Sequence, residues 1–366
     1  MIIGVHALHS VGPNAFNRDE NGFPKTMMLG NTRRGRISSQ AQKRAIRTQL
    51  ESRTADYIGW RTTHLRDKLL LPRLEQRLTD ISPEQLTTAA DVVITAFAGA
   101  QNSDGTLAAS IFTWALELEL LADLITENIT ELLSDDTATK RARKIAKTVA
   151  NANLPKSLSV ALFGRMIAAL PEGNIDGVTA FSDAFTTHPV FLNVDNFTSV
   201  DDLSERDTTG ANFLGDQPFL APSVFYRHFS INVTSLAEYL QDSIPVSTAV
   251  RAFMDAFWYA VPSGGKQRSF KADEFPQFVA VSIGGGGQSH GDAFAAPITD
   301  TNDLLTASID RFDDNWRRRD SMRRNPNEQV FVATGYPEAL SYLSNYHLAG
   351  GYDELLDRLE SAINEI

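Results

Sequence analysis

Apolar and polar positions at the start of the chain follow two different periods. Residues 2–8 predict a β-strand, and from Ser39 to about residue 51 the spacing becomes helical. The run SQAQ that begins at Ser39 fits a capping box, which marks the start of a helix. On this helix Gln40, Lys43 and Arg47 share one face, while small and apolar residues turn toward a core.

Helical spacing continues through the region that follows. Leucines between residues 65 and 78 mark an amphipathic stretch interrupted by Pro72, and a longer stripe keeps near-heptad spacing between residues 107 and 132. We interpret the longer stripe as core rather than as a partner surface. Cations then line one face of a further helix, at Lys140, Arg143, Lys144 and Lys147. A solvated face is the favoured interpretation of these cations, and contact with nucleic acid is the alternative.

Strands and helices alternate in the second half of the chain. Patterns typical of strands lie at residues 158–162, 223–233, 277–283 and 329–333. Helical stretches separate them near residues 178–187, 246–260 and 297–319. Apolar and polar residues alternate along 223–233, which predicts one buried face. Strands interleaved with helices predict an α+β or α/β sheet domain.

Composition limits the class of protein. The 366 residues suffice for about two domains or one domain with insertions, and 42% of them are hydrophobic, enough for a core. The absence of cysteine excludes disulfides, thiolate metal sites and cysteine nucleophiles. The N-terminal run MIIGVHALHS does not resemble a signal peptide, and no run of about 18 apolar residues occurs. We therefore expect a soluble, cytoplasmic protein without membrane contact.

The charge is distributed unevenly, although the net charge of −11 would normally argue against nucleic acid. Residues 17–47 carry eight basic side chains and two acidic ones, against 34 and 45 in the whole chain. Such a local reversal of sign indicates a site for a polyanion such as a nucleic-acid backbone. The Ser38 and Ser39 hydroxyls, the first-turn amides and the Lys43 and Arg47 side chains would converge to bind phosphate. The alternative is a solvated basic helix beside acidic neighbours, and charge and spacing alone do not separate the two.

The same segment resembles a known family. The run NRDxN…K…RRxRISSQxxKRAxR, from Asn17 to Arg47, resembles the signature of CasC, the repeated backbone subunit of the type I-E CRISPR Cascade complex. Shorter matches follow in order at Arg61–Leu65, Gly164–Met166, Thr186–His188, Phe197–Thr198, Val200–Leu203, Val224–Arg227, Ile231–Asn232 and Gly265–Arg268. Together they span the chain from residue 1 to about residue 270, and the tail matches weakly.

The resemblance implies an α+β fold with a modified ferredoxin-like, RRM-like palm, although the chain shows no RNP1-type aromatic stretch. The palm would comprise residues 1–52 and 158–366. Residues 53–157 would form a large helical fingers insertion. Residues 191–220, which are polar, acidic and turn-rich, would form a thumb hairpin that folds over the bound guide strand.

The resemblance also implies which side chains bind RNA. Contacts to phosphate and ribose are expected from Arg18, Lys25, Arg36, Ser38, Gln40, Lys43 and Arg47. Further RNA contacts are expected from Arg165, Met166, Phe197, Thr198, Lys266, Gln267 and Arg268. Met166 would offer the bases a flexible, polarizable thioether, and its alternative is a core position. The cluster from Lys266 to Arg268 would reach phosphate or sugar from a loop.

Phe197 is the candidate wedge of the thumb. A single apolar ring can pry a base step apart, because unstacking costs only a few kcal/mol and new stacking offsets it. The family carries a further aromatic residue immediately before this position, where this chain has Asn196, so the resemblance weakens for a wedge of two rings. Without the resemblance, Phe197 would be an ordinary hydrophobic anchor of a surface hairpin.

Two other segments carry no role in guide binding. The run Gly284–Gly287 lacks the lysine and hydroxyl of a P-loop, which favours a mobile linker. The basic residues Arg317–Arg319 and Arg323–Arg324 are compatible with contact to target DNA or an adjoining subunit. They are equally compatible with simple charge balance against the aspartates at 313, 314 and 320.

The sequence offers no constellation for catalysis, for a cofactor or for a metal. Its seven histidines show no HExxH motif and no paired metal-ligand spacing, so each is expected to be structural. The enzymatic alternative is a metal-assisted ribonuclease, as in related type III backbone subunits, with Asp19 or Glu20 as the acidic residue. An ion pair that positions Arg18 explains such a carboxylate equally well.

These observations predict a non-catalytic subunit that binds CRISPR guide RNA (crRNA). Copies would associate head to tail along the guide spacer, because a heterologous contact that does not close generates a filament. The bases would stay free to pair with invading target DNA, so that specificity belongs to base pairing. The expected partners in this antiviral ribonucleoprotein are crRNA, target DNA, further copies of the chain, and Cascade subunits of the CasA, CasB, CasD and CasE types.

Overall fold

The computed structural model describes residues 1–53, 57–199, 212–262, 272, 274–299, 302–322 and 325–365. The chain divides into two compact units. The first unit comprises Met1–Gln49, Ala180–Asn232 and Val250–Ile366, and the second comprises Leu50–Thr179 and Val233–Ala249. The second unit therefore contains two segments, residues 158–179 and 233–249, that lie outside the insertion expected at 53–157.

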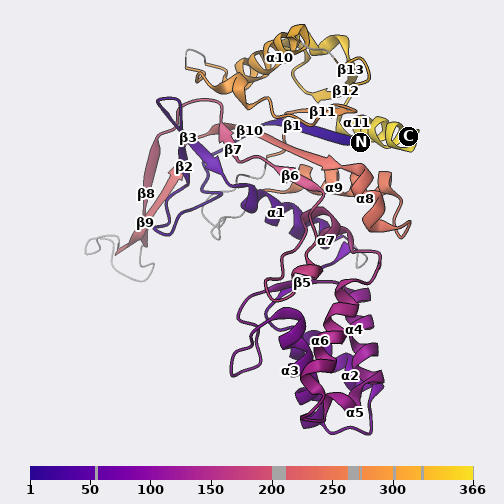
Figure 1. Cartoon of the computed structure of the whole chain (residues 1–366). Coiled ribbons are helices and arrows are strands. Elements are labelled where there is room, and N and C mark those ends of the chain that lie inside the picture. The colour runs from indigo at the N-terminus through magenta and orange to yellow at the C-terminus, as the bar shows by residue number, and fades with distance from the viewer. Residues whose placement is uncertain are drawn as a thin grey trace. The chain divides into compact units, whose positions relative to one another are not determined.

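The first unit is built on one mixed β-sheet (Figure 1). Nine strands of the described chain pair in it, in the order β13-β12-β11-β1-β10-β7-β3-β2, with β6 beside β10. In the middle, β1 (Ile2–Val11) pairs antiparallel with β10 (Ser223–Asn232) and with β11 (Phe278–Ile283). The other strands are β2 (Thr26–Leu29), β3 (Thr32–Ile37), β6 (Thr179–Phe181), β7 (Ala184–Thr186), β12 (Gln329–Thr334) and β13 (His347–Ala349). The mixture of strands and helices confirms the α+β class.

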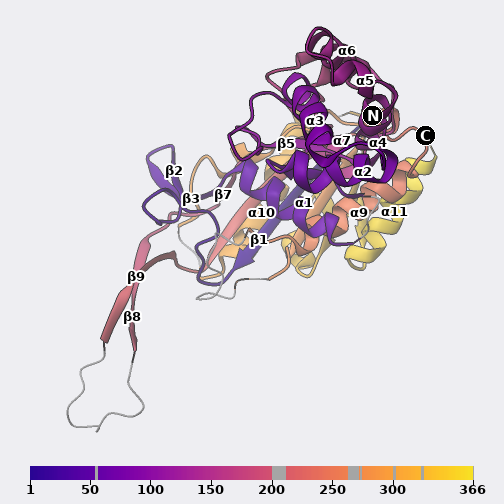
Figure 2. The ribbon, with the colours of Figure 1, turned by 90° about the horizontal axis from the view of Figure 1, so that it is seen from below.

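Helices pack on both faces of this sheet (Figure 2). On one face lies α10 (Leu304–Met322), whose Phe312 contacts Phe278 of β11 and Tyr226 of β10. On the other face lie α1 (Ser39–Glu51) and α9 (Val246–Tyr259), and α11 (Tyr352–Asn364) packs beside α9. Short 3₁₀ turns complete the unit: η4 (Gly291–Phe294), η5 (Pro337–Ala339) and η6 (Leu343–Asn345).

Coverage of both faces corrects one expectation about β10. The alternating pattern of residues 223–233 predicted one buried face, but both faces are buried. Tyr226 and His228 point toward α10, while Arg227 and Phe229 lie under α1 and α9. Two of these polar side chains have hydrogen-bond partners inside: the Tyr226 hydroxyl bonds to Nδ1 of His6 at 2.9 Å, and Nη1 of Arg227 bonds to Nδ1 of His9 at 3.3 Å. The His228 ring instead packs against the rings of His6 and Tyr226.

The second unit is mainly helical. Its helices are α2 (Leu71–Arg77), α3 (Pro83–Ala98), α4 (Ala115–Glu127), α5 (Ile129–Leu132), α6 (Ala138–Ala150), α7 (Leu158–Phe163) and α8 (Val233–Leu240), with a π-helix, η2 (Leu65–Leu70), and a 3₁₀ turn, η3 (Pro171–Gly173). A two-stranded sheet joins β4 (Trp60–Thr62) to β5 (Ile111–Thr113). The apolar stripe at 107–132 is buried in one core with α3 and α6, which confirms its interpretation as core.

Three predicted elements are wrong in type or extent. Residues 158–162 form helix α7 rather than a strand, because a short apolar run buries equally well in either conformation. Residues 178–187 form the short strands β6 and β7 rather than a helix. The helix expected at 297–319 begins only at Leu304 and continues to Met322. The strands at the chain start and near 223, 277 and 329, and the helices at 39 and 246, are confirmed.

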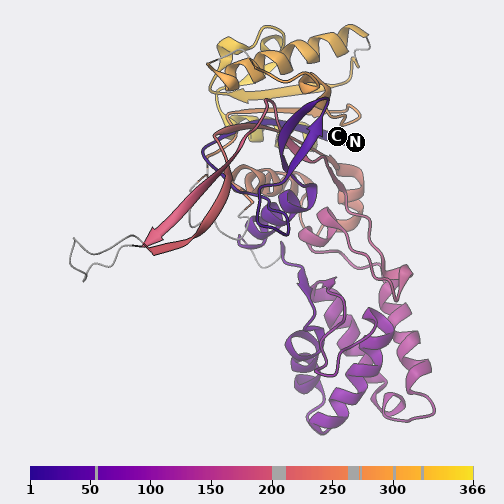
Figure 3. The ribbon, with the colours of Figure 1, turned by 90° about the vertical axis from the view of Figure 1, so that its left-hand side faces the viewer.

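An antiparallel hairpin, β8 (Leu192–Ser199) and β9 (Asn212–Leu220), follows β7 (Figure 3). Asn14 anchors its base, because the backbone N–H and C=O of Asn14 both bond to Leu220, at 3.1 and 2.8 Å. Leu220 also belongs to an apolar cluster with Val11 and Ile37. The hairpin expected at 191–220 is thus present in its described residues.

The glycine run at 284–287 contacts the sheet unit at both of its ends, and its interpretation as a mobile linker stays a prediction. The Gly284 N–H donates to the carbonyl of Ile2 at 3.3 Å, and its carbonyl accepts from Nδ2 of Asn325 at 3.0 Å. Gly287 has φ +64°, and a Cβ there would lie 2.8 Å from Ile2 and 2.9 Å from Ser230. Glycine is required because the backbone approaches β1 and β10 too closely for a side chain.

No helix in the described ranges has the length and apolar character of a membrane span.

Candidate nucleic-acid interface

Backbone hydrogen bonds gather the basic residues of the first unit. The Lys25 N–H donates to the Asn17 carbonyl at 2.7 Å, and the Arg36 N–H donates to the Lys25 carbonyl at 2.9 Å. The Ser38 N–H donates to Oδ1 of Asn17 at 2.9 Å, and Arg18 follows Asn17 directly. Residues well separated in sequence therefore lie on adjoining backbone where β3 leads into α1. We call Arg18, Lys25, Arg36, Ser38, Gln40, Lys43 and Arg47 the basic site.

Helix α1 is capped by Ser38, one residue earlier than predicted. The Oγ atom of Ser38 accepts from the Ala41 N–H at 3.3 Å, and its carbonyl accepts from the Gln42 N–H at 3.1 Å. The predicted capping box of Ser39 with Gln42 is wrong, because the Gln42 side chain turns inward to backbone carbonyls. The Ser39 N–H donates to Oδ1 of Asp183 at 2.7 Å. That amide, which was expected to bind phosphate, already has an anionic partner.

The exposed side of α1 carries the expected polar residues. Gln40 is exposed and Lys43 and Arg47 are half-buried, whereas Ile46 is fully buried on the other side. The Lys43 amine lies 5.6 Å from the centre of the Phe181 ring, which holds it by a cation–π contact. Burial lowers the pKa of Lys43 below its usual 10.5. A partly desolvated, oriented ammonium gains more from a phosphate than a fully hydrated one does.

Two neighbouring arginines of β3 have different environments. The Arg34 side chain is fully buried and donates to the carbonyls of Thr186, at 2.8 Å, and Phe294, at 3.0 Å. Arg34 therefore adds to the charge count of the segment but not to the basic site. Arg36 stays about one-third exposed, and its Nε atom pairs with Oδ2 of Asp183 at 2.6 Å. It makes no other side-chain hydrogen bond within the described residues, which leaves its terminal nitrogens open to a ligand.

The carboxylate of Asp19 shapes the loop that carries Arg18. Its Oδ1 atom accepts from the N–H groups of Asn21, at 3.0 Å, and Phe23, at 2.9 Å. This is the local turn geometry that aspartate favours, so Asp19 holds the backbone between Arg18 and Lys25 in place.

A second group of expected contacts lies in the second unit, on the loop after α7. Gly164 has φ +68°, and a Cβ there would lie 2.4 Å from the Gly177 nitrogen. Arg165 and Ile175 exchange two backbone hydrogen bonds, at 2.8 and 2.9 Å, which fix the turn. Met166 as a whole is 80% exposed, so it is not a core methionine. An exposed thioether on a fixed backbone turn is compatible with the expected apolar contact to bases.

Arg165, by contrast, points into the protein. Its side chain is 3% exposed and pairs with the buried Glu117 at 2.6 Å. It also donates to the carbonyls of Gly173, at 2.8 Å, and Phe112, at 3.2 Å, and lies over the Trp114 ring at 5.1 Å. The expectation of a direct RNA contact by Arg165 is therefore corrected: its guanidinium neutralises an interior carboxylate and anchors the loop that presents Met166.

Comparison with known proteins bears on both groups of residues. Residues 3–358 match the model of the CT1975-like protein family. The chain belongs to this family. Its membership confirms the resemblance to CasC-type CRISPR backbone subunits. No curated protein sequence matches the chain.

Two solved structures have the fold of this CT1975-like protein. One belongs to a CRISPR RNA-guided surveillance complex described as pre-nicking, with a TM-score of 0.81 and 24% identity over 99% of this chain and 100% of that chain. The other belongs to a CRISPR RNA-guided surveillance complex, with a TM-score of 0.73 and 22% identity over the same shares. At these identities the likeness shows a common fold.

Other expected contacts of the CT1975-like chain are only partly described. Phe197 and Thr198 lie in β8, where the pairing register with β9 shifts between them, opposite Gly215 and Phe213. Their side chains lie outside the description, so the wedge stays a prediction. Lys266, Gln267 and Arg268 lie outside the described residues altogether.

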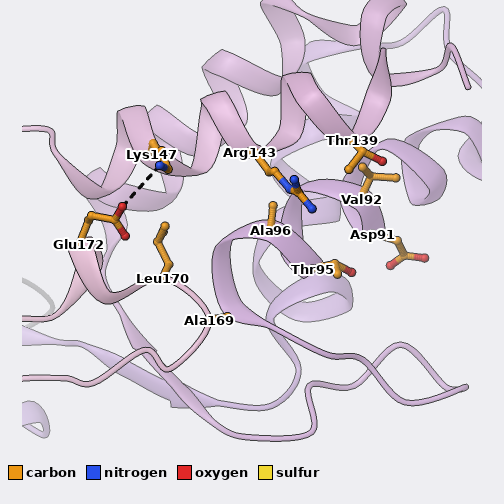
Figure 4. A pocket seen from close by; sticks show the side chains of 10 residues that line it. All are labelled: Asp91, Val92, Thr95, Ala96, Thr139, Arg143, Lys147, Ala169, Leu170 and Glu172. Carbon is orange, nitrogen blue, oxygen red and sulfur yellow. Dashed lines mark ion pairs between the residues drawn. The ribbon is translucent and has the colours of Figure 1, made fainter. Parts of the chain in front are cut away.

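A second cationic surface follows α6 in the helical unit of the protein. Lys140, Arg143, Lys144 and Lys147 are all exposed, opposite the buried Ala142, Ile145, Ala146 and Val149. Arg143 points into a cavity of about 660 Å³ between α3 and α6, and the Lys147 amine pairs with Glu172 on its rim at 3.5 Å (Figure 4). This surface fits the favoured interpretation as a solvated face, and its contact with nucleic acid stays the alternative.

The arginines of α10 balance nearby acids. Arg317 and Arg318 both pair with Asp314, at 2.5 and 2.6 Å, and Arg319 pairs with Asp292. The Asp313 carboxylate instead accepts from the backbone of residues 341–343. Charge balance is thus confirmed for Asp314, and contact of these arginines with target DNA or an adjoining subunit stays a prediction. Arg323 and Arg324 lie outside the described residues.

Sequence reasoning missed two residues next to the basic site, Phe181 and Asp183. Phe181 ends β6 and Asp183 lies between β6 and β7, in a stretch that the pattern predicted as helix. Asp183 is 144 residues from Ser39, and no local spacing relates the two. A single acidic residue between Ser182 and Ala184 carries no signal of its own.

Proposed function

We propose that this chain is the repeated backbone subunit of a type I-E CRISPR RNA-guided surveillance complex and holds the guide strand through its sugar–phosphate backbone. The family membership and the full-length fold likeness support the class. The observation that carries the binding role is the basic site, where cations from the loop before β2, from β3 and from α1 lie on adjoining backbone. The whole chain is acidic, so this concentration of positive charge favours a polyanion there.

The chemistry of the basic site fits backbone rather than base recognition. Its members are cations, a hydroxyl and an amide, which bind phosphate and ribose oxygens without reading sequence. Arg36 and Lys43 are oriented by Asp183 and Phe181, so less entropy is lost when a phosphate binds. Base edges then remain free to pair with invading DNA.

The parts of the fold take up roles within this proposal. The sheet unit would be a modified ferredoxin-like palm, the helical unit the fingers, and the β8–β9 hairpin the thumb, with Phe197 as the wedge. Copies of the chain would associate head to tail along crRNA in the cytoplasm, beside subunits of the CasA, CasB, CasD and CasE types. Met166 and the loop from Lys266 to Arg268 would add contacts to the guide.

The central experiment compares Lys43→Glu with Arg311→Glu. Arg311 is an exposed cation on α10, on the opposite face of the sheet from α1. Its variant therefore makes the same change of net charge in the same unit, away from the basic site. Binding to a fluorescent single-stranded RNA would be measured by anisotropy over a range of salt. We expect Lys43→Glu to weaken binding by about tenfold or more and to make the log–log salt slope shallower by about 0.7, the value of one phosphate contact on a single strand.

Arg311→Glu should retain the wild-type slope and most of the affinity, and both variants should unfold thermally near wild type because neither side chain is in the core. Wild-type affinity of Lys43→Glu, or an equal loss in both variants, would exclude the basic site as the guide contact. Purification from the native host should recover bound RNA and companion subunits.

We further propose that the subunit is not a nuclease. The rival assignment is a metal-assisted ribonuclease that uses Asp19 or Glu20. Incubation of the purified protein with RNA and Mg²⁺ or Mn²⁺ should give no cleavage above that of an Asp19→Asn variant, which keeps an oxygen to hold the loop. Metal-dependent cleavage lost in that variant would replace our assignment with the ribonuclease.

A further inference from the structure

The short segment from Phe181 to Asp183 contacts α1 and the end of β3 at three successive residues. The Phe181 ring lies under the Lys43 amine, and the Ser182 carbonyl accepts from Nε2 of Gln42 at 3.0 Å. Asp183 contributes both of its carboxylate oxygens. The segment therefore forms the support on which α1 and Arg36 are mounted.

The two oxygens of Asp183 have different partners. Oδ1 accepts from the Ser39 N–H at 2.7 Å, in the first turn of α1, which has no acidic residue of its own. Oδ2 accepts from Nε of Arg36 at 2.6 Å. One carboxylate thus joins β3 to the helix start and adds a negative charge where the helix dipole favours one.

The contact with Arg36 engages only one edge of the guanidinium. Binding through Nε holds the side chain in place and leaves the two terminal nitrogens for a ligand, which is the geometry that phosphate requires. An arginine without this partner would sample many rotamers and would lose that freedom on binding.

Resting on the proposed function, we infer that Asp183 is a positioning residue for guide RNA, a carboxylate that strengthens the binding of a polyanion by orienting Arg36 and the start of α1. Charge alone predicts the opposite. A carboxylate beside phosphates repels them, so its removal should tighten binding if Asp183 had no other role. The two mechanisms thus differ in sign, which makes the inference easy to test.

The decisive variant is Asp183→Asn in the full chain. The asparagine oxygen can still accept from the Ser39 N–H, but its amide no longer holds Arg36. We expect RNA affinity at about 0.1 M salt, where surface charges are partly screened, to fall by about fivefold. The salt slope should become shallower by about 0.7, because one phosphate contact is lost. Tighter binding, or an unchanged slope, overturns the inference.

Asp357→Asn is the matched control. Asp357 of α11 pairs with Nη1 of Arg251 at 2.7 Å, so this variant makes the same charge change in another ion pair of the same unit. It should change neither slope nor affinity by more than the small gain from added positive charge. A loss equal to that of Asp183→Asn would show a general effect of charge or folding and would refute positioning.

A double-variant cycle with Arg36→Gln shows through which residue Asp183 acts. If Asp183 works through Arg36, adding Asp183→Asn to Arg36→Gln should cause little further loss. Fully additive losses would mean that Asp183 does not act through Arg36. Thermal unfolding distinguishes a loss of RNA affinity from a loss of stability, since Asp183→Asn should remain folded at the assay temperature.

The inference and the proposed function fail in different ways. If Lys43→Glu binds RNA as well as wild type, the proposed function is wrong whatever Asp183 does. If Lys43→Glu weakens binding while Asp183→Asn strengthens it, the basic site stands and only the positioning role is lost.

Discussion

Mild acid should destabilise the sheet unit through a group of buried imidazoles. His6, His228 and His290 lie together under α10, with the His6 ring centre 4.8 Å from that of His228 and 5.0 Å from that of His290. Burial, with a smaller effect of Arg319, lowers the pKa of His228 and of His290 from 6.5 to about 4. Burial also lowers the pKa of His6, and the other two imidazoles add to the effect.

The direction follows from where protons bind. In the unfolded chain these imidazoles take up protons near pH 6.5, whereas in the folded chain His228 and His290 stay neutral until about pH 4. Between these values the unfolded chain binds more protons, so stability falls as the pH falls. From pH 7 to pH 5 each of the two should remove about 2 kcal/mol from the free energy of unfolding. Together that is a large part of the roughly 5–15 kcal/mol that stabilises an ordinary domain.

Hydrogen–deuterium exchange at pH 7 and pH 5, corrected for intrinsic rates, measures this loss in β1 and β10 without interference from the helical unit. Urea titrations at the same pH values give the overall free energy. His228→Asn and His290→Asn should each lower the free energy of unfolding at pH 7. Each should also reduce the loss of that free energy between pH 7 and pH 5 by the contribution of one imidazole, about 2 kcal/mol. His64→Asn, at an exposed histidine of the other unit, is the control and should leave this loss unchanged.

A wild-type pH dependence in both His228→Asn and His290→Asn would refute the reasoning. It would mean that the loss at pH 5 comes from other groups, such as the buried His9 of β1, whose pKa burial lowers from 6.5 to about 3. A sheet unit equally stable at pH 7 and pH 5 would refute it as well, since the lowered pKa values could not then hold in solution.

Two further predictions concern the other expected contacts. Arg165→Met should lower the free energy of unfolding of the helical unit by about 3–5 kcal/mol, because it leaves Glu117 buried without a counter-charge. In a denaturant titration, a double variant with Glu117→Gln should recover part of this loss. An Arg165→Met protein as stable as wild type that has lost only RNA affinity would contradict the interior role. Phe197→Ala should keep most RNA affinity but alter which bases a chemical probe modifies along bound RNA, and an unaltered pattern would exclude the wedge.

Long regular patterns in the sequence were sufficient to predict their elements, whereas short ones succeeded near 277 and 329 but failed at 158–162 and 178–187. The strand near residue 2 and the helices at 39 and 246 are long enough that the spacing of their apolar positions can be distinguished from chance. Residues 158–162 are not, because a short apolar run can bury itself in a strand or in a helix. The two strands that replace the helix expected at 178–187 have three residues each, too few for an alternation to register.

The basic site was predictable as a region but not as an arrangement. The excess of cations at 17–47 located it, since charge is additive along a sequence. Alternation places Arg34 and Arg36 on the same side of β3, yet only Arg34 is covered, by β7 and η4. That difference depends on elements more than 140 residues away, as does the support from Asp183. The sequence can therefore name the cations, while the fold decides which of them reach a ligand.

The loop that carries Met166 offers a practical opportunity. The main-chain contacts of Gly164 with Gly177 and of Arg165 with Ile175 hold it, and none of them involves the Met166 side chain. Residue 166 can therefore be exchanged without disturbing its support. A photoreactive or fluorescent amino acid installed there would occupy a defined position on the protein surface. It would crosslink to, or report on, any molecule that binds beside it.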